Sequence, residues 1–422
     1  MRGVMATGSG GAACRHATGA PAAGAHPRRR GRGVVAVCLE TALVLAALWP
    51  GGRPSAAGGP RRDLCPGGWV RAAGMRAPRL FQTATPLTDG RVLVAGGGGP
   101  PSAELYDPRA GTWTATERMR AFRYNHTATR LADGRVLVVG GNGGGNTVLA
   151  SAELYDPRTG RWAATGRMHS ARAFHTTTLL PDGRVLVAGG QGTTDSGGPA
   201  LVSAELYAPR TGRWAATGAM RAPHRSHTAT VLRAGLVLVV GGRVGADLAG
   251  DRSAELYDPR RGAWATTGVL HAGRVAHTAT LLLDGRVLVA GGSGAGGSGA
   301  GAEVYDPRGG RWSITGSLRA ARLGHTATLL PDGRVLVAGG TTPTTFALTS
   351  AELYDPRVGR WASAGRMHVG RTGHTATLLL DGRVLVAGAV RLVTGDALRP
   401  LAAAELYVPG APATPWGGVG AC

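Results

Sequence analysis

Three features of the sequence predict an all-β fold made of seven similar units. Tryptophans recur with spacings of 49, 52, 50, 48 and 49 residues between positions 113 and 361. Histidines between positions 126 and 374 keep the same spacings, and an Ala-Glu-(Leu/Val)-Tyr element occurs seven times. Four short strands in a unit of roughly 50 residues are typical of one propeller blade. The sequence therefore predicts a seven-bladed β-propeller of four-stranded antiparallel blades over residues 69–409.

Each unit divides into four strands in a fixed order. In the unit that begins at His325, the first strand is HTATLL at 325–330, and a Pro-Asp-Gly turn leads to RVLVAGG at 334–340. A variable loop precedes SAELYDP at 350–356, and a second turn leads to RWAS at 360–363. Asp-Gly between apolar runs predicts a hairpin, and Asp-Pro-x-x-Gly predicts a further turn. No stretch of the unit shows a helical period.

The residues that recur suit a core built by stacking. The chain has 71 glycines and only 5% aromatic residues, so its core must be made mostly of small and branched side chains. One blade cannot bury both faces of its sheet, and neighbouring blades must therefore stack around a ring. The double glycine that closes each second strand permits close backbone approach. We expect the repeated tyrosines and tryptophans to supply buried area rather than a binding surface.

The order of the pieces predicts how the ring closes. The chain enters the repeat region with a lone fourth strand at Trp69 and leaves it after three strands over residues 374–409. The simplest ring places the Trp69 strand on the outside of the seventh blade, which removes exposed sheet edges. Cys65 precedes that strand and Cys422 follows the last one, so we predict a Cys65–Cys422 disulfide that clasps the ring. Because the bridge would close so long a loop, it would stabilise the fold by about 4–5 kcal/mol in the chain-entropy model.

The first 57 residues resemble an export signal. Four arginines between 28 and 32 precede the apolar run 34–49, and small residues follow at 55–57. A run of about 16 residues is short for a membrane span, which needs about 20, but suits a signal-peptide core. We predict a signal peptide or N-terminal anchor at 1–57, a linker at 58–68 and a C-terminal tail at 410–422. The protein is then secreted or held in the cell envelope, and contacts a membrane only if the N-terminal segment is uncleaved.

The strong positive charge does not predict a nucleic-acid partner. The formal net charge is +22, and every basic residue is arginine. Many of these arginines recur at fixed turn positions, so they belong to the repeat and form no local basic stripe. Aromatic side chains do not alternate with basic ones, as they do in grooves that stack nucleic-acid bases. We expect no nucleic-acid binding.

The double glycine followed by a spaced tyrosine and tryptophan resembles the kelch motif in all seven units. The seventh is degenerate, with Gly388-Ala389 in place of Gly-Gly. The resemblance covers about four-fifths of the chain. In this respect the chain is similar to exported bacterial kelch-repeat proteins. It extends distantly to the propeller of galactose oxidase and related copper-radical oxidases. Their chemistry needs a tyrosine cross-linked to a cysteine, whereas the seven units here contain no cysteine.

The six repeated histidines invite a metal-site hypothesis that their spacing opposes. Equivalent positions lie on different blades, and packed sheets are about 10 Å apart, whereas zinc needs donors at about 2 Å. We therefore predict one hydrogen-bonded histidine per blade and no metal or other cofactor. The glutamate of each Ala-Glu-Leu-Tyr element is expected to pair with a repeated arginine. Both the Asp-Gly-Arg arginine and the arginine of Arg-x-x-His are candidates, and the sequence does not choose between them.

The topology predicts which side of the propeller binds ligands. Loops between the second and third strands, and connections from one unit to the next, emerge on one side and carry most of the sequence variation. Variable loops on a rigid scaffold are a usual site of recognition. The few aromatic residues outside the repeat pattern, Phe81 among them, fall there with several charged residues. The candidate ligand-binding residues are Phe346, Tyr124, Phe122, Phe174, Arg243, Asp247, Asp251 and Arg391.

These observations predict a non-catalytic protein. We expect an exported, monomeric binding or adhesion module for carbohydrate or for an envelope or extracellular protein. Two alternatives stay open: a copper-radical oxidase or a degenerate relative of one, and a structural envelope protein without a specific ligand. No serine-hydrolase, metalloprotease or phosphate-loop pattern is present.

Overall fold

The computed structural model describes residues 67–410, apart from residue 146 and the segments 194–198, 244–249, 295–298 and 394–396. The side chains of 391–398 are likewise outside the described part. The predicted signal or anchor at 1–57, most of the linker, both cysteines of the predicted disulfide and nearly all of the tail at 410–422 lie outside it. Those predictions therefore stay predictions.

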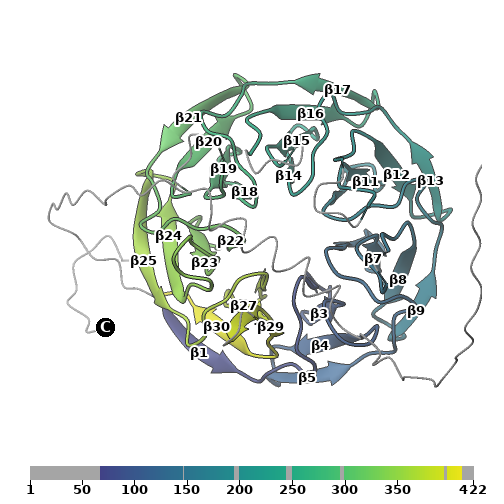
Figure 1. The fold of residues 1–422 in the computed structure, drawn as a ribbon, viewed down its shortest axis with the longest axis horizontal. Coiled ribbons are helices and arrows are strands. Elements are labelled where there is room, and N and C mark those ends of the chain that lie inside the picture. The colour runs from purple at the N-terminus through teal and green to yellow at the C-terminus, as the bar shows by residue number, and fades with distance from the viewer. Residues whose placement is uncertain are drawn as a thin grey trace, which may run out of the picture. The chain divides into compact units, whose positions relative to one another are not determined.

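Residues 67–410 form a ring of seven four-stranded antiparallel sheets, as predicted (Figure 1). No helix in the described ranges is long and apolar enough to cross a membrane. Blade 1 comprises β2 (Thr83–Pro86), β3 (Val92–Ala95), β4 (Ala103–Asp107) and β5 (Thr112–Ala115). Blade 2 comprises β6 (Thr127–Arg130), β7 (Val136–Val139), β8 (Ala152–Asp156) and β9 (Arg161–Ala164). Blade 3 comprises β10 (Thr176–Leu179), β11 (Val185–Ala188), β12 (Ala204–Ala208) and β13 (Arg213–Ala216). Blade 4 comprises β14 (Thr228–Val231), β15 (Val237–Val240), β16 (Ala254–Asp258) and β17 (Ala263–Thr266). Blade 5 comprises β18 (Thr278–Leu281), β19 (Val287–Ala290), β20 (Ala302–Asp306) and β21 (Arg311–Thr315). Blade 6 comprises β22 (Thr326–Leu329), β23 (Val335–Ala338), β24 (Ser350–Asp355) and β25 (Arg360–Arg366).

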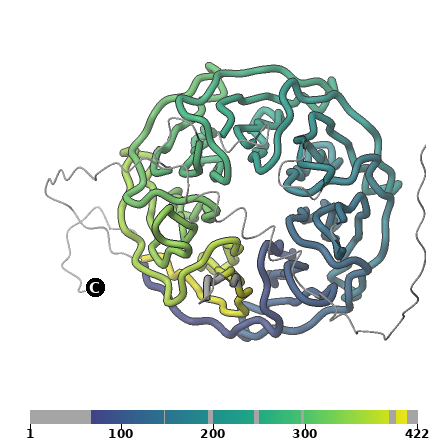
Figure 2. Tube along the Cα trace, viewed as in Figure 1, coloured from purple at the N-terminus to yellow at the C-terminus, as the bar shows by residue number. Residues whose placement is uncertain are grey.

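Blade 7 closes the ring in the predicted way. Its strands are β26 (Thr375–Leu378), β27 (Val384–Ala387), β30 (Ala404–Val408) and, on the outside, β1 (Gly68–Ala72). Trp69 pairs with Tyr407 across the β1–β30 ladder, and Figure 2 shows the purple N-terminal strand beside the yellow strands of blade 7. An additional hairpin, β28 (Val390–Val393) with β29 (Ala397–Pro400), stands in the loop between the second and third strands of this blade.

The core lies between the blades. The second strand of every blade is fully buried, because it is the centre of a sheet covered on both faces. Each cluster of buried side chains combines residues of two neighbouring blades, for example Leu93 of β3 with Val136 of β7 and Tyr155 of β8. This is the physical reason that a single blade cannot be stable alone.

The repeated aromatic residues are structural, as predicted. Each tyrosine of a third strand packs against the tryptophan of the neighbouring fourth strand, with ring centroids 4.9–5.2 Å apart. The tryptophan indole N–H then donates to the preceding blade. Trp264, for example, reaches the carbonyl of Gly218 at 2.7 Å, and Trp69 reaches that of Ala364 at 2.8 Å. The outer strands are thereby tied to one another around the ring.

Candidate functional site

The propeller has two chemically different sides. We call the loop side the one that carries the loops between second and third strands and the connections between blades. We call the turn side the one that carries the Asp-Gly-Arg turns and the Asp-Pro turns. The predicted ligand-binding residues that the structure describes belong to segments of the loop side.

The loop side is organised by a buried arginine in front of the first strand in six of the seven blades. The Arg123 guanidinium pairs with Glu153 at 2.8 Å and also donates to the carbonyl of Gly140 at 2.8 Å, with both charged side chains almost fully buried. The arginine of Arg-x-x-His is therefore the partner of the repeated glutamate, which the sequence left open. The same pair recurs as Arg79–Glu104, Arg172–Glu205, Arg274–Glu303, Arg322–Glu352 and Arg371–Glu405.

The arginines of the Asp-Gly-Arg turns do something else. Arg135 pairs with Asp133 of its own turn at 2.7 Å, with both side chains partly exposed to solvent. These pairs lie on the turn side, far along the sheet from the glutamates. The arginines of Arg-x-x-His are thus buried and pair with the repeated glutamates, whereas those of Asp-Gly-Arg are partly exposed and pair within their own turn. The sequence alone did not show which of the two pairs with the glutamate.

Each repeated histidine is hydrogen-bonded, as predicted, and its partner threonine lies in the preceding blade. His126 lies just before β6, and its Nε2 is 3.1 Å from the hydroxyl of Thr83 in blade 1. Burial, with a smaller contribution from the Arg123 charge, lowers the His126 pKa to about 3, so the ring is neutral. In blade 1 Gln82 takes this place and donates to the carbonyl of Ala387 in blade 7. The other pairs are His175–Thr127, His227–Thr176, His277–Thr228, His325–Thr278 and His374–Thr326.

The residue before each histidine or Gln82 adopts a left-handed backbone conformation. In five blades this residue is not glycine, and its φ lies between 52° and 56°. Backbone hydrogen bonds link these positions around the inner edge of the propeller; Asn125 N–H, for example, donates to the Phe81 carbonyl at 3.2 Å. We call this set the left-handed ring; its members are Phe81, Asn125, Phe174, Ser226, Ala276, Gly324 and Gly373.

Two phenylalanines in the left-handed ring are the least expected members. A left-handed backbone is uncommon for any residue with a side chain and is an outlier for a bulky one, with a cost of about 1–3 kcal/mol. Gly324 and Gly373 occupy the same position in blades 6 and 7 without that cost. The Phe81 and Phe174 side chains are half-buried, so part of each ring faces solvent.

In blades 1 to 3 a polar residue, Asn125, therefore stands between two phenylalanines along the left-handed ring. Asn125 follows Phe81 and precedes Phe174 around the left-handed ring, and its side chain is also half-buried. The sequence analysis missed Asn125 and this arrangement. The glycines before His325 and His374 were the available signal, because glycine at a fixed position suggests a positive φ.

The other predicted aromatic residues lie nearby on the loop side. Phe122 is half-buried and packs on Tyr124 with ring centroids 5.8 Å apart. Tyr124 is only 5% exposed, so it supports Phe122 and presents little surface itself. Phe346 is half-buried and packs with Phe81 against a small cluster of Leu80 and Val390. The predicted aromatic residues thus lie in three places: Phe122 and Tyr124 before blade 2, Phe174 before blade 3, and Phe346 where blades 1, 6 and 7 meet.

Two predicted charged residues of blade 4, Arg243 and Asp251, lie beside a departure from the repeat. His224 replaces the usual arginine; its Nε2 is 3.3 Å from Glu255 and its Nδ1 is 2.8 Å from the carbonyl of Gly241. Arg225 is 3% exposed, and burial together with the charge of Arg243 lowers its pKa to about 10. Asp251 lies 3.6 Å from His224 and bonds Ser253 in its own turn, so it has a structural role.

Two predicted site residues cannot be placed. Asp247 and the side chain of Arg391 lie outside the described residues, although the backbone of Arg391 is in β28. The candidate site is therefore built from the left-handed ring and the aromatic side chains around it.

Within the described ranges, no group of three or more histidine, cysteine, aspartate or glutamate side chains is placed to hold a metal ion. The repeated histidines are held on separate blades, each with Nε2 bonded to a threonine. The tyrosines of the third strands are buried against tryptophans. The hydrogen bonds of the histidines and the packing of the tyrosines thus hold these side chains in structural roles.

Comparisons with known proteins agree with this architecture. Residues 123–168, which span blade 2, match the family model described as Kelch motif. Blade 2 is one of seven copies of the same repeat, and the protein is a seven-bladed kelch-type β-propeller. No curated protein matches the sequence.

Two solved structures show the same fold at low identity. One is described as a novel fungal alcohol oxidase with catalytic diversity among the AA5 family, in complex with copper. It is 19% identical with a TM-score of 0.65, over 81% of this chain and 76% of that one. The other is described as the structure of YjhT, and it is 17% identical with a TM-score of 0.55, over 70% of this chain and 99% of that one. Identities this low establish the fold alone.

Proposed function

We propose that the protein is an exported, non-catalytic binding module that recognises carbohydrate through its loop side, with Phe81, Asn125 and Phe174 at the centre of the site. The single observation that supports this proposal is the left-handed ring. Two partly exposed phenylalanines occupy strained positions that glycine fills elsewhere in the same ring. Selection for stability alone would favour glycine or asparagine at these positions.

The chemistry of the three side chains favours carbohydrate. An aromatic face offers an apolar platform to the C–H face of a sugar, and an amide both donates and accepts hydrogen bonds, as hydroxyl groups require. An apolar surface with a small number of placed polar groups is the usual composition of a small-ligand site. An envelope or extracellular protein is the alternative ligand, and a structural protein with no specific ligand is a third possibility.

The experiment measures binding of residues 58–422 to a panel of polysaccharides and to cell-envelope protein fractions. The test variant is Phe174→Gly, and the matched control is Ala276→Gly, which makes the same backbone change in the same ring without removing an aromatic face. We expect saturable polysaccharide binding that Phe174→Gly weakens at least about tenfold, while thermal stability is unchanged or higher. Ala276→Gly should leave binding unchanged.

Additional variants locate the site within the loop side. Phe346→Ala and a Gly/Ser replacement of loop 243–252 test the two regions that the sequence also indicated. Saturable binding only to protein fractions would replace the carbohydrate assignment with an envelope partner. Absence of binding to every fraction, or binding that Phe174→Gly does not alter, would contradict the proposed site. A copper-loading assay with an oxidation readout would then test the oxidase alternative.

A further inference from the structure

The turn side carries a repeated bond between neighbouring blades. In four blades the arginine of the Asp-Gly-Arg turn donates from its guanidinium to the carbonyl of the proline that follows the next blade's third strand. Arg184, for example, reaches the Pro259 carbonyl at 2.9 Å while its other donors hold Asp182. The same bond joins Arg91 to Pro157, Arg135 to Pro209 and Arg383 to Pro108, at 3.2–3.5 Å. These contacts fill the gap between adjacent turns.

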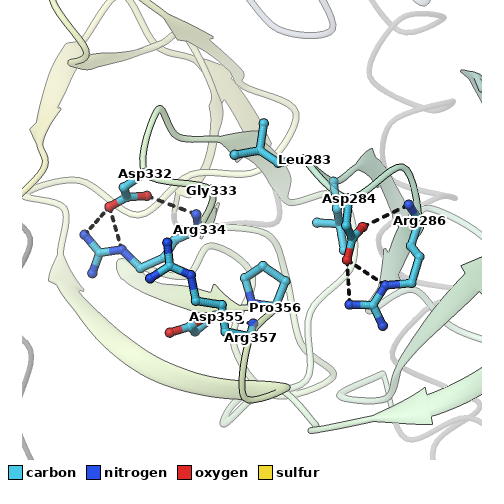
Figure 3. Close-up of a pocket in the computed structure, with 10 residues that line it drawn as sticks. Leu283, Asp284, Arg286, Asp332, Gly333, Arg334, Asp355, Pro356 and Arg357 are labelled. Atoms are coloured by element: carbon cyan, nitrogen blue, oxygen red, sulfur yellow. Dashed lines mark hydrogen bonds and ion pairs between the residues drawn. The ribbon is translucent and has the colours of Figure 1, made fainter. Parts of the chain in front are cut away.

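The junction between blades 5 and 6 lacks this bond. Arg286 is the equivalent arginine and Pro356 the equivalent proline, but within the described residues Arg286 bonds only Asp284 of its own turn, at 2.7 Å. A cleft of about 490 Å³ lies at this junction and is lined by both residues. Figure 3 shows two ion pairs on opposite sides of the cleft, Asp284–Arg286 and Asp332–Arg334, with Pro356 between them.

Three guanidinium groups and three carboxylates line the cleft. The third carboxylate, Asp355, accepts the backbone N–H of Arg357. Both flanking aspartates accept two bonds from their own arginine in addition to its backbone N–H. Arg357 also lines the cleft, and its guanidinium has no hydrogen bond or ion pair to any described residue. At four other junctions the equivalent arginine donates a guanidinium N–H to a proline carbonyl, and Arg286 makes no such bond to a described residue. Leu283, which is 58% exposed, adds an apolar surface at the edge.

We propose that this cleft binds an acidic peptide segment of a partner protein. A peptide carbonyl would occupy the position beside Arg286 that a proline carbonyl occupies at four other junctions, and a carboxylate would pair with Arg357. Guanidinium groups bind carboxylates through charge-assisted hydrogen bonds with defined geometry. The formal charge of +22 on the chain also favours encounter with an acidic partner. This site is on the side opposite the left-handed ring and does not depend on the proposed carbohydrate site.

Fluorescence anisotropy with residues 58–422 tests the proposal. The probe is a fluorescein-labelled, end-blocked peptide Gly-Glu-Asp-Pro-Glu-Gly, and the matched probe is Gly-Gln-Asn-Pro-Gln-Gly, which keeps the backbone without the carboxylates. We expect saturable binding of the acidic probe that falls with rising salt, and binding at least about tenfold weaker for the neutral probe.

Two variants at equivalent turn positions locate the site. Arg357→Ala should weaken binding of the acidic probe about tenfold. Arg158→Ala removes the corresponding arginine at the closed junction of blades 1 and 2 and should leave binding unchanged. Arg286→Gln should weaken binding as well, whereas Phe174→Gly should not, because Phe174 is on the loop side.

Three results would overturn the proposal. Equal losses for Arg357→Ala and Arg158→Ala would mean that the probe samples the general positive charge. Absence of saturable binding would mean that the cleft does not accept such a peptide. Displacement of the probe by polygalacturonate, at the same carboxylate concentration as an effective unlabelled peptide, would assign the cleft to acidic polysaccharide instead.

Discussion

The repeated histidines are buried and neutral, and each joins its blade to the preceding one through a hydrogen bond. His277 is buried, its Nε2 is bonded to Thr228 at 2.9 Å, and burial with the nearby Arg274 charge lowers its pKa to about 3. The same ring approaches the glycine at the end of the preceding blade's second strand, where a larger residue would collide with it. A protonated ring at this position would be a buried cation beside the arginine of its own Arg-x-x-His segment. Protonation is therefore opposed by the fold.

The first prediction is that acid destabilises the propeller through these histidines. Their pKa is about 6.5 in an unfolded chain, and in the fold His126, His277 and His374 have a pKa of about 3. The stabilisation is therefore complete above about pH 6.5 and is lost as the pH falls towards 3, because the unfolded chain then takes up protons that the folded one does not. Near pH 5.5 each histidine should contribute a loss of about 1 kcal/mol.

His277→Gln isolates this effect, because Gln82 already fills the equivalent place in blade 1. Denaturant unfolding between pH 7.5 and 5.5 should show a smaller loss of unfolding free energy in His277→Gln than in the parent, by about 1 kcal/mol. An identical pH dependence in the two proteins would show that these histidines titrate normally in the fold.

The second prediction concerns the buried arginine–glutamate pairs. Glu352 accepts from Arg322 at 2.7 Å and from two backbone N–H groups, and both charged side chains are almost fully buried. Glu352→Ala leaves the Arg322 charge buried and unpaired, which should cost about 3–5 kcal/mol of unfolding free energy. Asp133→Asn breaks an exposed pair on the turn side and should cost less than about 1 kcal/mol. Urea unfolding measures both, and comparable costs would contradict the distinction between the two classes of arginine.

At the scale of the element, the double glycine fixes how closely blades can stack. Gly339 ends a second strand with φ of 65°, and a methyl group there would stand 2.6 Å from the Arg371 carbonyl and 2.7 Å from the His374 ring. Gly160, in an outer turn, has a similar φ of 73° but nothing within 4 Å of the same position. The two glycines share the same backbone requirement and differ in the approach of the next blade.

The third prediction follows from that contrast. Gly160→Ala should cost about 1 kcal/mol, because only the backbone is strained. Gly339→Ala should cost about 3 kcal/mol or more, because the added methyl group also forces blades 6 and 7 apart. Differential scanning calorimetry of the two variants separates the contributions. Equal shifts in melting temperature would mean that close stacking of the blades does not determine the need for glycine.

The strands and their pairing could be predicted because each element carries its own local signal. The Asp-Gly turns, the alternation in HTATLL and the invariant tyrosine and tryptophan define four strands per unit, and the structure confirms them. The hairpin β28–β29 was not predicted, since its loop is unlike those of the other six blades. The left-handed ring escaped prediction as well, because backbone dihedral angles at Phe81 or Phe174 are imposed by contacts between blades and leave no trace in those residues themselves.

The candidate sites show the same division. Phe122, Phe174 and Phe346 could be placed on the loop side from strand order alone. The turn-side cleft could not be foreseen, because Arg286 and Arg184 stand in almost identical sequences. Their difference arises only from how adjacent turns meet, with Arg184 reaching a carbonyl that Arg286 does not reach.

At the scale of the whole ring, three sets of bonds join neighbouring blades. Histidine–threonine bonds act along the inner edge, tryptophan indoles act at the outer edge, and arginine–carbonyl bonds act at several junctions on the turn side. Each set repeats with the sequence, so most junctions depend on neighbouring segments of chain. Blade 7 is the exception, because its sheet combines β30 from one end of the described chain with β1 from the other. The stability of the entire ring therefore depends on one strand of five residues.

The fourth prediction tests this dependence. A chain that begins at residue 75 lacks β1, which exposes the edge of β30 and removes the Trp69 ring from its place 5.2 Å from Tyr407. Exposed strand edges promote association, so size-exclusion chromatography should show oligomers, and the unfolding transition should be broader than in residues 58–422. Because Gly68 lies opposite Val408 in the antiparallel pair, a copy of residues 67–74 joined after Gly410 through a short Gly-Ser linker has the right direction to refill the position. This permuted chain should be monomeric and should unfold cooperatively. A chain that begins at residue 75 and is already monomeric and cooperative would show that the ring closes without β1.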